Sequence, residues 1–185
     1  RYVNTENLKK CYFKDIQFDM KKFEKKNCIK IAEGQDFIEY SPLTFSYMKK
    51  ITKIIESNNG GILIIDYGYN NKKTKNTLQA ILNHKYSNIL ENIGFSDITY
   101  NLNFNFLKKI IKKICMLDVK ITSQRKFLLK MGILKRAEIL SKNLNFKKKA
   151  DMSYRINRLI DPNQMGDLFK VMFITKKKNF FKQGF

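Results

Sequence analysis

Several side chains that could do chemistry stand directly after a run of apolar residues. Residues 62–65 are apolar at every position, and Asp66, Tyr67 and Gly68 follow at once. Such a short run is typical of a strand buried on both faces of a parallel sheet. Ligands bind at the carboxyl ends of these strands, where Asp66 would accept hydrogen bonds from amino, hydroxyl or guanidinium groups. A structural carboxylate that caps the next turn is an equally good interpretation.

Two further side chains are candidates for proton transfer or for holding a cationic group. His84 is the only histidine, and imidazole is the side chain whose ordinary pKa lies near neutrality. A surface histidine is nevertheless the favoured interpretation. Asp97 precedes an alternating segment, and a turn carboxylate is favoured there over a second acidic group at the cleft of Asp66.

Helices and strands must position these groups. Ser41 and Pro42 are typical of a helix start, and residues 58–61 (NNGG) of its end. The apolar residues at positions 43, 47, 51, 54 and 55 predict one buried stripe on that helix. A helix, a tight turn and a buried strand together indicate one unit of an α/β parallel sheet.

The remaining elements follow from periodicity. We expect strands over 12–18 and 28–31, joined by a charged connection at 21–27. Spacing predicts a helix over 77–90, with Thr77 and His84 sharing one stripe, and alternation predicts a strand over 98–104. Helices are predicted at 107–114, 127–131, 134–140 and 154–160, and a closing strand at 168–175. No linker or repeat marks a domain boundary.

Composition limits the classes of function. Lys and Arg number 37 against 16 acidic residues, a net charge of +21, but only five are Arg and the lysines form small dispersed groups. We therefore read most of them as solvated surface and do not favour a nucleic-acid site. Three cysteines without short spacing predict no metal site and suit a reducing compartment. No apolar run is long enough to span a membrane. No G-x-G or G-x-x-x-x-G-K loop is present.

Five stretches, in matching order and spacing, resemble consecutive blocks of the MidA-like methyltransferases. They are residues 60–69 (GGILIIDYGY), 77–86 (TLQAILNHKY), 96–104 (SDITYNLNF), 123–133 (SQRKFLLKMGI) and 158–171 (RLIDPNQMGDLFKV). These are class I enzymes that use S-adenosyl-L-methionine, and mitochondrial members are arginine methyltransferases needed for respiratory complex I assembly. The resemblance implies a partial Rossmann-like sheet with flanking helices and a helical C-terminal insertion.

The resemblance also implies how much of the domain is present. It covers only the family's C-terminal part, so we expect residues 1–185 to be the C-terminal portion of one methyltransferase domain. Most cofactor-binding residues would lie upstream of Arg1, and the chain alone is expected to be inactive.

The family's motifs can be placed residue by residue. Asp66 and Asp97 are the carboxylates expected to hold a guanidinium, with His84 a weaker candidate for taking up its proton. Aromatic rings would stack on the acceptor. The expected substrate-binding residues are Tyr67, Gly68, Tyr69, Thr77, Gln79 and Thr99.

The expected partner follows from the same resemblance, whereas the expected location rests on composition. The implied acceptor is a protein, such as a subunit of respiratory complex I. The composition favours a bacterial cytoplasm, with a mitochondrial matrix as the alternative. A different class of function is a non-catalytic basic domain that binds RNA or an anionic protein. A degenerate methyltransferase that acts as an assembly factor is a third.

Overall fold

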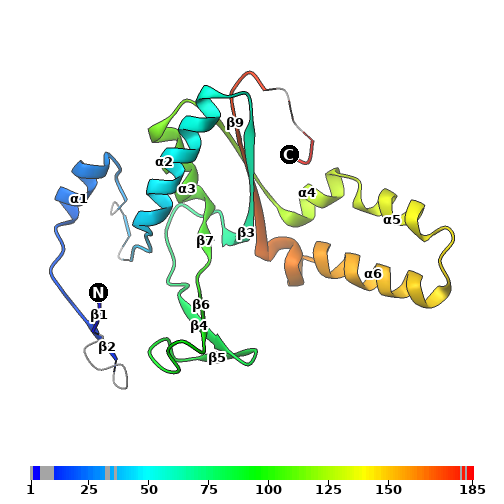
Figure 1. Ribbon diagram of the computed structural model, residues 1–185, viewed down its shortest axis with the longest axis horizontal. Coiled ribbons are helices and arrows are strands. Elements are labelled where there is room, and N and C mark those ends of the chain that lie inside the picture. Colours follow the sequence, from blue (N-terminus) through cyan, green and yellow to red (C-terminus); the bar gives the residue numbers. More distant parts are fainter. Residues whose placement is uncertain (1, 5–10, 32–33, 36, 180, 182) are drawn as a thin grey trace. The chain divides into compact units, whose positions relative to one another are not determined.

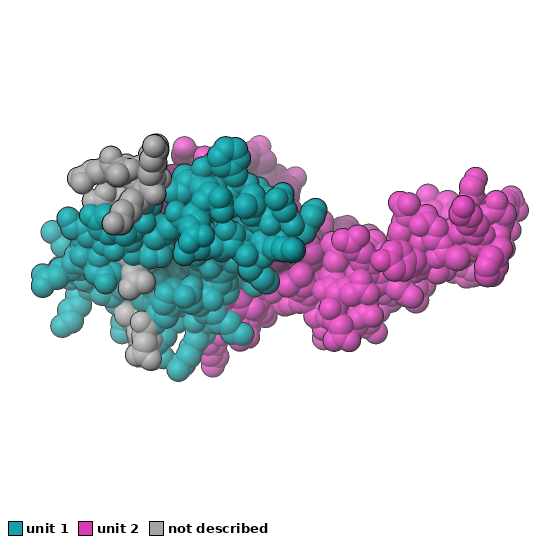
Figure 2. Space-filling view, turned by 90° about the horizontal axis from the view of Figure 1, so that it is seen from below, with its two compact units in different colours: residues 1–40, 73–101 teal, residues 41–72, 102–185 magenta. Residues whose placement is uncertain are grey.

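The computed structural model of the chain describes residues 2–4, 11–31, 34–35, 37–179, 181 and 183–185. The chain forms two compact units, each made of two segments (Figure 2). Unit 1 comprises Arg1–Tyr40 and Lys73–Asn101, and unit 2 comprises Ser41–Lys72 and Leu102–Phe185. The two units are described separately below.

Unit 2 is built on a four-stranded sheet with the order β7-β3-β9-β8 (Figure 1). β3 (Gly61–Tyr69) is parallel to β7 (Leu102–Asn103). β9 (Phe169–Thr175) lies between β3 and β8 (Asp118–Ser123) and is antiparallel to both. β8 was not predicted, although Val119 and Ile121 alternate with polar residues in the way a strand requires.

Two helices pack on one face of this sheet and form the core (Figure 1). They are α2 (Pro42–Ser57) and α3 (Phe104–Ile114). As predicted, Ser41 caps α2, its side-chain oxygen accepting from the Thr44 amide at 3.3 Å, and Pro42 takes the first helical position. α3 begins earlier than predicted, because Asn103 caps it and ends the short strand β7. The core contains Phe104, Ile111, Met172 and Ile174, all fully buried.

The predicted stripe of α2 is partly wrong. Its buried residues are Met48, Thr52 and Ile55, whereas Leu43, Tyr47 and Ile54 are exposed. The Thr52 hydroxyl is satisfied by donating to the Met48 carbonyl at 2.7 Å, so a polar residue replaces an apolar one in the core stripe.

The C-terminal helices extend beyond the sheet as an arm of unit 2 (Figure 1). They are α4 (Gln124–Lys130), α5 (Ile133–Ser141) and α6 (Phe146–Ile160), followed by a π-helical turn, η1 (Pro162–Gly166). All three helices were predicted in shorter form. Their boundaries have clear causes: Ser123 caps α4, Gly132 separates α4 from α5 in a left-handed conformation, and Pro162 follows the end of α6.

Over its described residues, unit 1 contains one helix and two small antiparallel sheets. β1 (Tyr2–Asn4) pairs with β2 (Tyr12–Lys14), and α1 (Met20–Asn27) follows. The strand predicted over 28–31 and the connection predicted over 21–27 are wrong, because Asp19 caps a helix there and Cys28 closes it in the left-handed conformation. The second sheet has the order β5-β4-β6, from β4 (Gln79–Leu82), β5 (Lys85–Ser87) and β6 (Asp97–Thr99).

The helix predicted over 77–90 is therefore wrong. Leu82 pairs with Lys85, so only Asn83 and His84 connect β4 to β5. Both connecting residues have positive φ, 49° and 61°, which is the conformation of a type I′ hairpin turn. Asn accepts that conformation readily, and the right-handed twist of the hairpin favours it.

Candidate functional site

The strongest motif, Asp66 to Tyr69, lies at the carboxyl-terminal end of β3 in unit 2. Asp66 is exposed, and its Oδ1 accepts a hydrogen bond from the Tyr67 amide at 2.8 Å. Across the sheet Asp66 stands opposite Lys170, which in turn stands opposite Ser123. The carboxylate is thus available near the carboxyl end of β3, which is the end of a strand where ligands of α/β proteins bind.

The residues around Asp66 have structural roles in the sheet. The Tyr67 ring packs against Phe169, with 4.6 Å between ring centroids, and 42% of Tyr67 stays exposed. Gly68 is buried where β3 meets β7, and an added Cβ would clash with the Leu102 carbonyl and lie 2.7 Å from the Phe104 ring. Gly68 therefore permits close strand packing; its predicted role at a substrate stays a prediction. Tyr69, the last residue of β3, pairs with Asn103.

Sequence reasoning missed a polar cavity at this end of the sheet. It has a volume of about 440 Å³ and lies entirely in unit 2. Burial lowers the pKa of Lys170, while the nearby Asp167 carboxylate acts in the opposite direction. The Lys170 ammonium donates to the Asp167 carbonyl oxygen. The lining residues are Asn70, Ile121, Thr122, Ser123, Lys126, Asp167 and Lys170.

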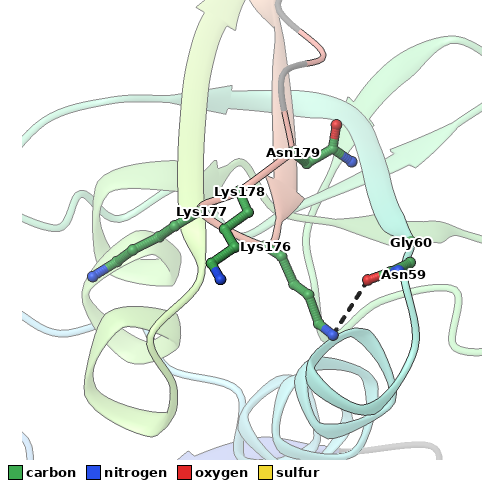
Figure 3. Close-up of a pocket in the computed structure, with 6 residues that line it drawn as sticks. All are labelled: Asn59, Gly60, Lys176, Lys177, Lys178 and Asn179. Atoms are coloured by element: carbon green, nitrogen blue, oxygen red, sulfur yellow. Dashed lines mark hydrogen bonds between the residues drawn. The ribbon is translucent and has the colours of Figure 1, made fainter.

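A second cavity lies at the opposite, amino-terminal end of β3 and is basic (Figure 3). Three consecutive lysines, Lys176 to Lys178, line about 650 Å³ together with Asn59, Gly60 and Asn179. The Lys176 Nζ donates to the Asn59 Oδ1 at 3.4 Å. Lysine ammonium groups of this kind attract phosphate or carboxylate groups.

The other predicted site residues lie in unit 1, where hydrogen bonds bring four of the polar side chains together in pairs. The Thr77 hydroxyl donates to the Glu39 Oε2 at 2.6 Å and accepts from the Asn101 amide at 2.9 Å. The Gln79 Nε2 donates to the Thr99 Oγ1 at 3.1 Å, which joins β4 to β6. Thr77, Gln79 and Thr99 are therefore already engaged within unit 1.

His84 and Asp97 are exposed in the same unit. His84 occupies the hairpin turn, and Asp97 begins β6 opposite Ile81. Within the described part of the chain, neither side chain makes a hydrogen bond or an ion pair. Asp66 belongs to unit 2, so its predicted common cleft with these two residues stays a prediction.

Burial disfavours thiol chemistry at one cysteine, and metal chemistry finds little support in the described residues. Cys115 is buried, and that burial raises the pKa of its thiol, which disfavours the reactive thiolate. Over the residues that the structure describes, no group of three or more His, Cys, Asp and Glu side chains could hold a metal ion. Within the same residues, no helix is both long and apolar enough to cross a membrane.

Comparison with known sequences decides the family. Residues 2–123 match the sequence family of S-adenosyl-L-methionine-dependent methyltransferases. The chain belongs to this methyltransferase family. Its resemblance to the MidA-like enzymes is thereby confirmed, and the match extends from unit 1 into the sheet of unit 2.

Curated relatives of the chain are named as mitochondrial protein arginine methyltransferases. The chain is 31% identical over 144 residues to the protein arginine methyltransferase NDUFAF7, mitochondrial, of Xenopus tropicalis, covering 77% of this chain and 33% of that protein. It is 30% identical over 125 residues to the Danio rerio protein of the same name, covering 66% and 29%. The chain thus spans about a third of the length of these relatives.

Two solved structures from Burkholderia thailandensis share the fold. One uncharacterized protein superimposes with a TM-score of 0.80 at 20% identity, over 99% of this chain and 50% of its own. The other, described as a likely methyltransferase bound to S-adenosyl-homocysteine, superimposes with a TM-score of 0.75 at 19% identity, over 98% and 48%. The predicted α/β, Rossmann-like methyltransferase fold is confirmed.

Proposed function

We propose that the chain is the C-terminal portion of an S-adenosyl-L-methionine-dependent protein arginine methyltransferase. The observation that carries this proposal is the family match over residues 2–123, together with relatives named as protein arginine methyltransferases. The chain spans only part of those relatives. In this proposal the activity therefore needs the rest of the methyltransferase polypeptide as well as this chain.

The residues of this chain do not by themselves fit the cofactor. The Gly-rich loops that hold nucleosides or phosphates are missing from the sequence. The cavity at the carboxyl end of β3 is lined by two lysines, Lys126 and Lys170, against one carboxylate, Asp167, and the excess of positive charge disfavours a sulfonium group. We therefore assign this chain the acceptor side of the reaction, and the cofactor to the remainder of the fold.

Asp66 is the side chain best suited to hold the acceptor. It is an exposed carboxylate near the carboxyl end of β3, and a guanidinium would donate two parallel hydrogen bonds to it. Such a clamp aligns the acceptor nitrogen with the methyl group, which is most of what an in-line transfer requires. Asp97 and His84 are kept in the proposal as a second carboxylate and a proton acceptor.

The biological setting is a finer part of the same proposal. The relatives are named as mitochondrial proteins, which favours the mitochondrial matrix over the bacterial cytoplasm. A protein acceptor follows from the same names. A link to respiratory complex I assembly, with one of its subunits as acceptor, rests on the family resemblance.

Calorimetry and a transfer assay test the proposal. S-adenosyl-homocysteine is titrated into this chain alone and into a longer polypeptide that includes the sequence encoded upstream of Arg1. We expect binding only by the longer protein. Binding by neither protein would overturn the methyltransferase proposal.

The role of Asp66 is tested in the longer protein. Asp66→Asn should lower kcat/KM for an arginine peptide roughly tenfold or more, since a hydrogen bond to a charged group contributes about 1.5–3 kcal/mol. Asp151→Asn, which changes an exposed carboxylate on α6, is the matched control and should leave the rate unchanged. Equal rates for Asp66→Asn and the unmodified protein would remove Asp66 from the site.

A further inference from the structure

A row of three polar residues crosses the sheet of unit 2 beside its core. Asp66 on β3 stands opposite Lys170 on β9, and Lys170 stands opposite Ser123 on β8. Residues that stand directly opposite one another on antiparallel strands share one face of the sheet. The preceding row on this face is apolar and consists of Ile64, Met172 and Ile121. The polar row therefore lies where the core ends and a surface that can bind polar groups begins.

The polar cavity of about 440 Å³ at this end of the sheet is built on the same row. Lys170 and Ser123 both line it. Lys126 joins them from α4, where its backbone amide donates to the Ser123 Oγ at 3.4 Å. Asp66 stands beside Lys170 on the neighbouring strand. The carboxylate proposed to hold the acceptor and the cavity are thus one strand apart on one face.

The cavity carries an excess of positive charge. Its charged lining consists of two ammonium groups, on Lys126 and Lys170, and one carboxylate, on Asp167. The Lys170 ammonium donates to the backbone carbonyl of Asp167, and within the described part of the chain neither lysine forms an ion pair. Lys170 is half-buried, and burial lowers the pKa of its ammonium, so water compensates that charge only in part. One negative charge from a ligand would neutralise the cavity.

We propose that this cavity binds a side-chain carboxylate of the methyl acceptor, so that the methyltransferase selects arginines with an acidic residue nearby. The inference rests on the proposed function and names the substrate class of the same site. Asp66 holds the guanidinium, while Lys126 and Lys170 donate hydrogen bonds to the carboxylate. The single excess positive charge of the lining matches a carboxylate better than a doubly charged phosphate.

The spacing of the strands sets how far apart the two groups of the acceptor lie. Neighbouring strands are about 4.8 Å apart, so Asp66 and Ser123, with β9 between them, are separated by about 10 Å. An extended peptide advances about 3.3 Å per residue. We therefore expect the acidic residue within about two to four residues of the arginine.

The test uses arginine peptides that carry one glutamate at each position of this window in turn, each paired with its glutamine counterpart. The longer protein should show a kcat/KM roughly tenfold higher for the best glutamate peptide, as expected for a hydrogen bond between charged groups. Lys126→Gln combined with Lys170→Gln should abolish this preference. Lys148→Gln combined with Lys149→Gln removes the same charge from two exposed lysines of α6, and this matched control should keep the preference.

A binding measurement on this chain alone gives a readout other than activity. The best glutamate peptide should raise the pKa of Lys170, because a neighbouring carboxylate favours the charged ammonium, and its glutamine counterpart should not. NMR titration of the lysine side chain measures this pKa. Lys126→Arg keeps the positive charge and should retain the preference for glutamate. Equal kcat/KM within every peptide pair, or a preference that survives the Lys126→Gln, Lys170→Gln variant, would overturn the inference.

The outcomes separate this inference from the proposed function. Methyl transfer without any preference for glutamate would remove the carboxylate site and leave the methyltransferase standing. No transfer to any peptide, together with a rise in the pKa of Lys170 that requires glutamate, would leave the carboxylate site standing and remove the methyltransferase. If the Lys126→Gln, Lys170→Gln variant keeps the preference but binds S-adenosyl-homocysteine more weakly, the cavity serves the carboxylate of the cofactor and the inference is wrong.

Discussion

At the residue scale, Lys170 has the most directly measurable electrostatic environment. Burial lowers the pKa of its ammonium, and the negative charge of Asp167 partly opposes that change. Asp167→Asn should therefore lower the pKa of Lys170 further, as read by NMR titration of the lysine side chain. Asp151→Asn on α6 is the control and should leave that pKa unchanged. A rise on removing the Asp167 charge would contradict the assignment.

The same pKa change has a consequence for stability. Because the pKa of Lys170 is lower in the folded chain, the unfolded chain binds more protons between the two values. The contribution of Lys170 to the free energy of unfolding therefore increases with pH across this alkaline window. Asp167→Asn should widen the window, which denaturant unfolding at a series of pH values would show.

Residue types alone were enough to nominate part of the candidate site. Asp66 and Gly68 could be recognised because they follow an apolar run in one continuous motif. Lys170 could not, because only the register of β9 beside β3 and β8 places it opposite Asp66 and Ser123. Lys126 reaches the same cavity from α4. Thr77 and Gln79 were predicted to lie on a helix, whereas Gln79 begins the strand β4. Their hydrogen-bond partners Glu39 and Thr99 could therefore not be predicted.

At the element scale, the contact between β3 and β7 depends on a missing side chain. A Cβ at Gly68 would clash with the Leu102 carbonyl and the Phe104 ring, so Gly68→Ala should destabilise the chain by about 1–3 kcal/mol. Gly60→Ala is the matched control, because nothing lies within 4 Å of its added Cβ. Denaturant unfolding of the two variants compares them. Equal free energies of unfolding would mean that β7 moves to make room for the added methyl group without destabilising the chain.

The hairpin of β4 and β5 allows a test that separates structure from catalysis at His84. Its φ of 61° is strained for histidine but not for glycine, so His84→Gly should stabilise the chain by about 1 kcal/mol. Thermal unfolding measures this. In the longer protein, methyl transfer should persist if His84 serves only the turn. Lost transfer with a raised melting temperature would establish the imidazole as a catalytic group.

The elements differ in how far sequence could predict them. The helices after residue 124 have caps and breaks, Ser123, Gly132 and Pro162, that are visible in the sequence. Residues 77–90 carry apolar residues at helical spacing, and only the left-handed pair Asn83 and His84 makes them a hairpin. α1 is mostly charged and buries no residue, so no apolar stripe could mark it.

At the scale of the whole molecule, the net charge of +21 predicts weak binding to any polyanion. The cavity lined by Lys176 to Lys178 is the feature that supports the alternative of a basic binding domain. We expect binding of a single-stranded RNA, followed by fluorescence anisotropy, to weaken steeply with salt and to ignore sequence.

Changing Lys176, Lys177 and Lys178 together to glutamine should weaken the salt dependence of RNA binding. The slope of log affinity against log salt should fall by about 2, at roughly 0.7 per phosphate contact. A clear sequence preference, or affinity that survives at high salt, would instead put the RNA-binding domain ahead of the methyltransferase.

The position of β9 has a consequence for biosynthesis. It is the last strand of its sheet to be translated, yet it lies between β3 and β8. While the ribosome makes everything before residue 169, the apolar strand β3 lacks the β9 neighbour that pairs with it along Gly61 to Tyr67. Nascent chains in this state expose the surfaces that aggregate. Chaperone capture during translation is therefore expected, and a stop codon ahead of β9 should abolish the sheet although most of its residues have already been made.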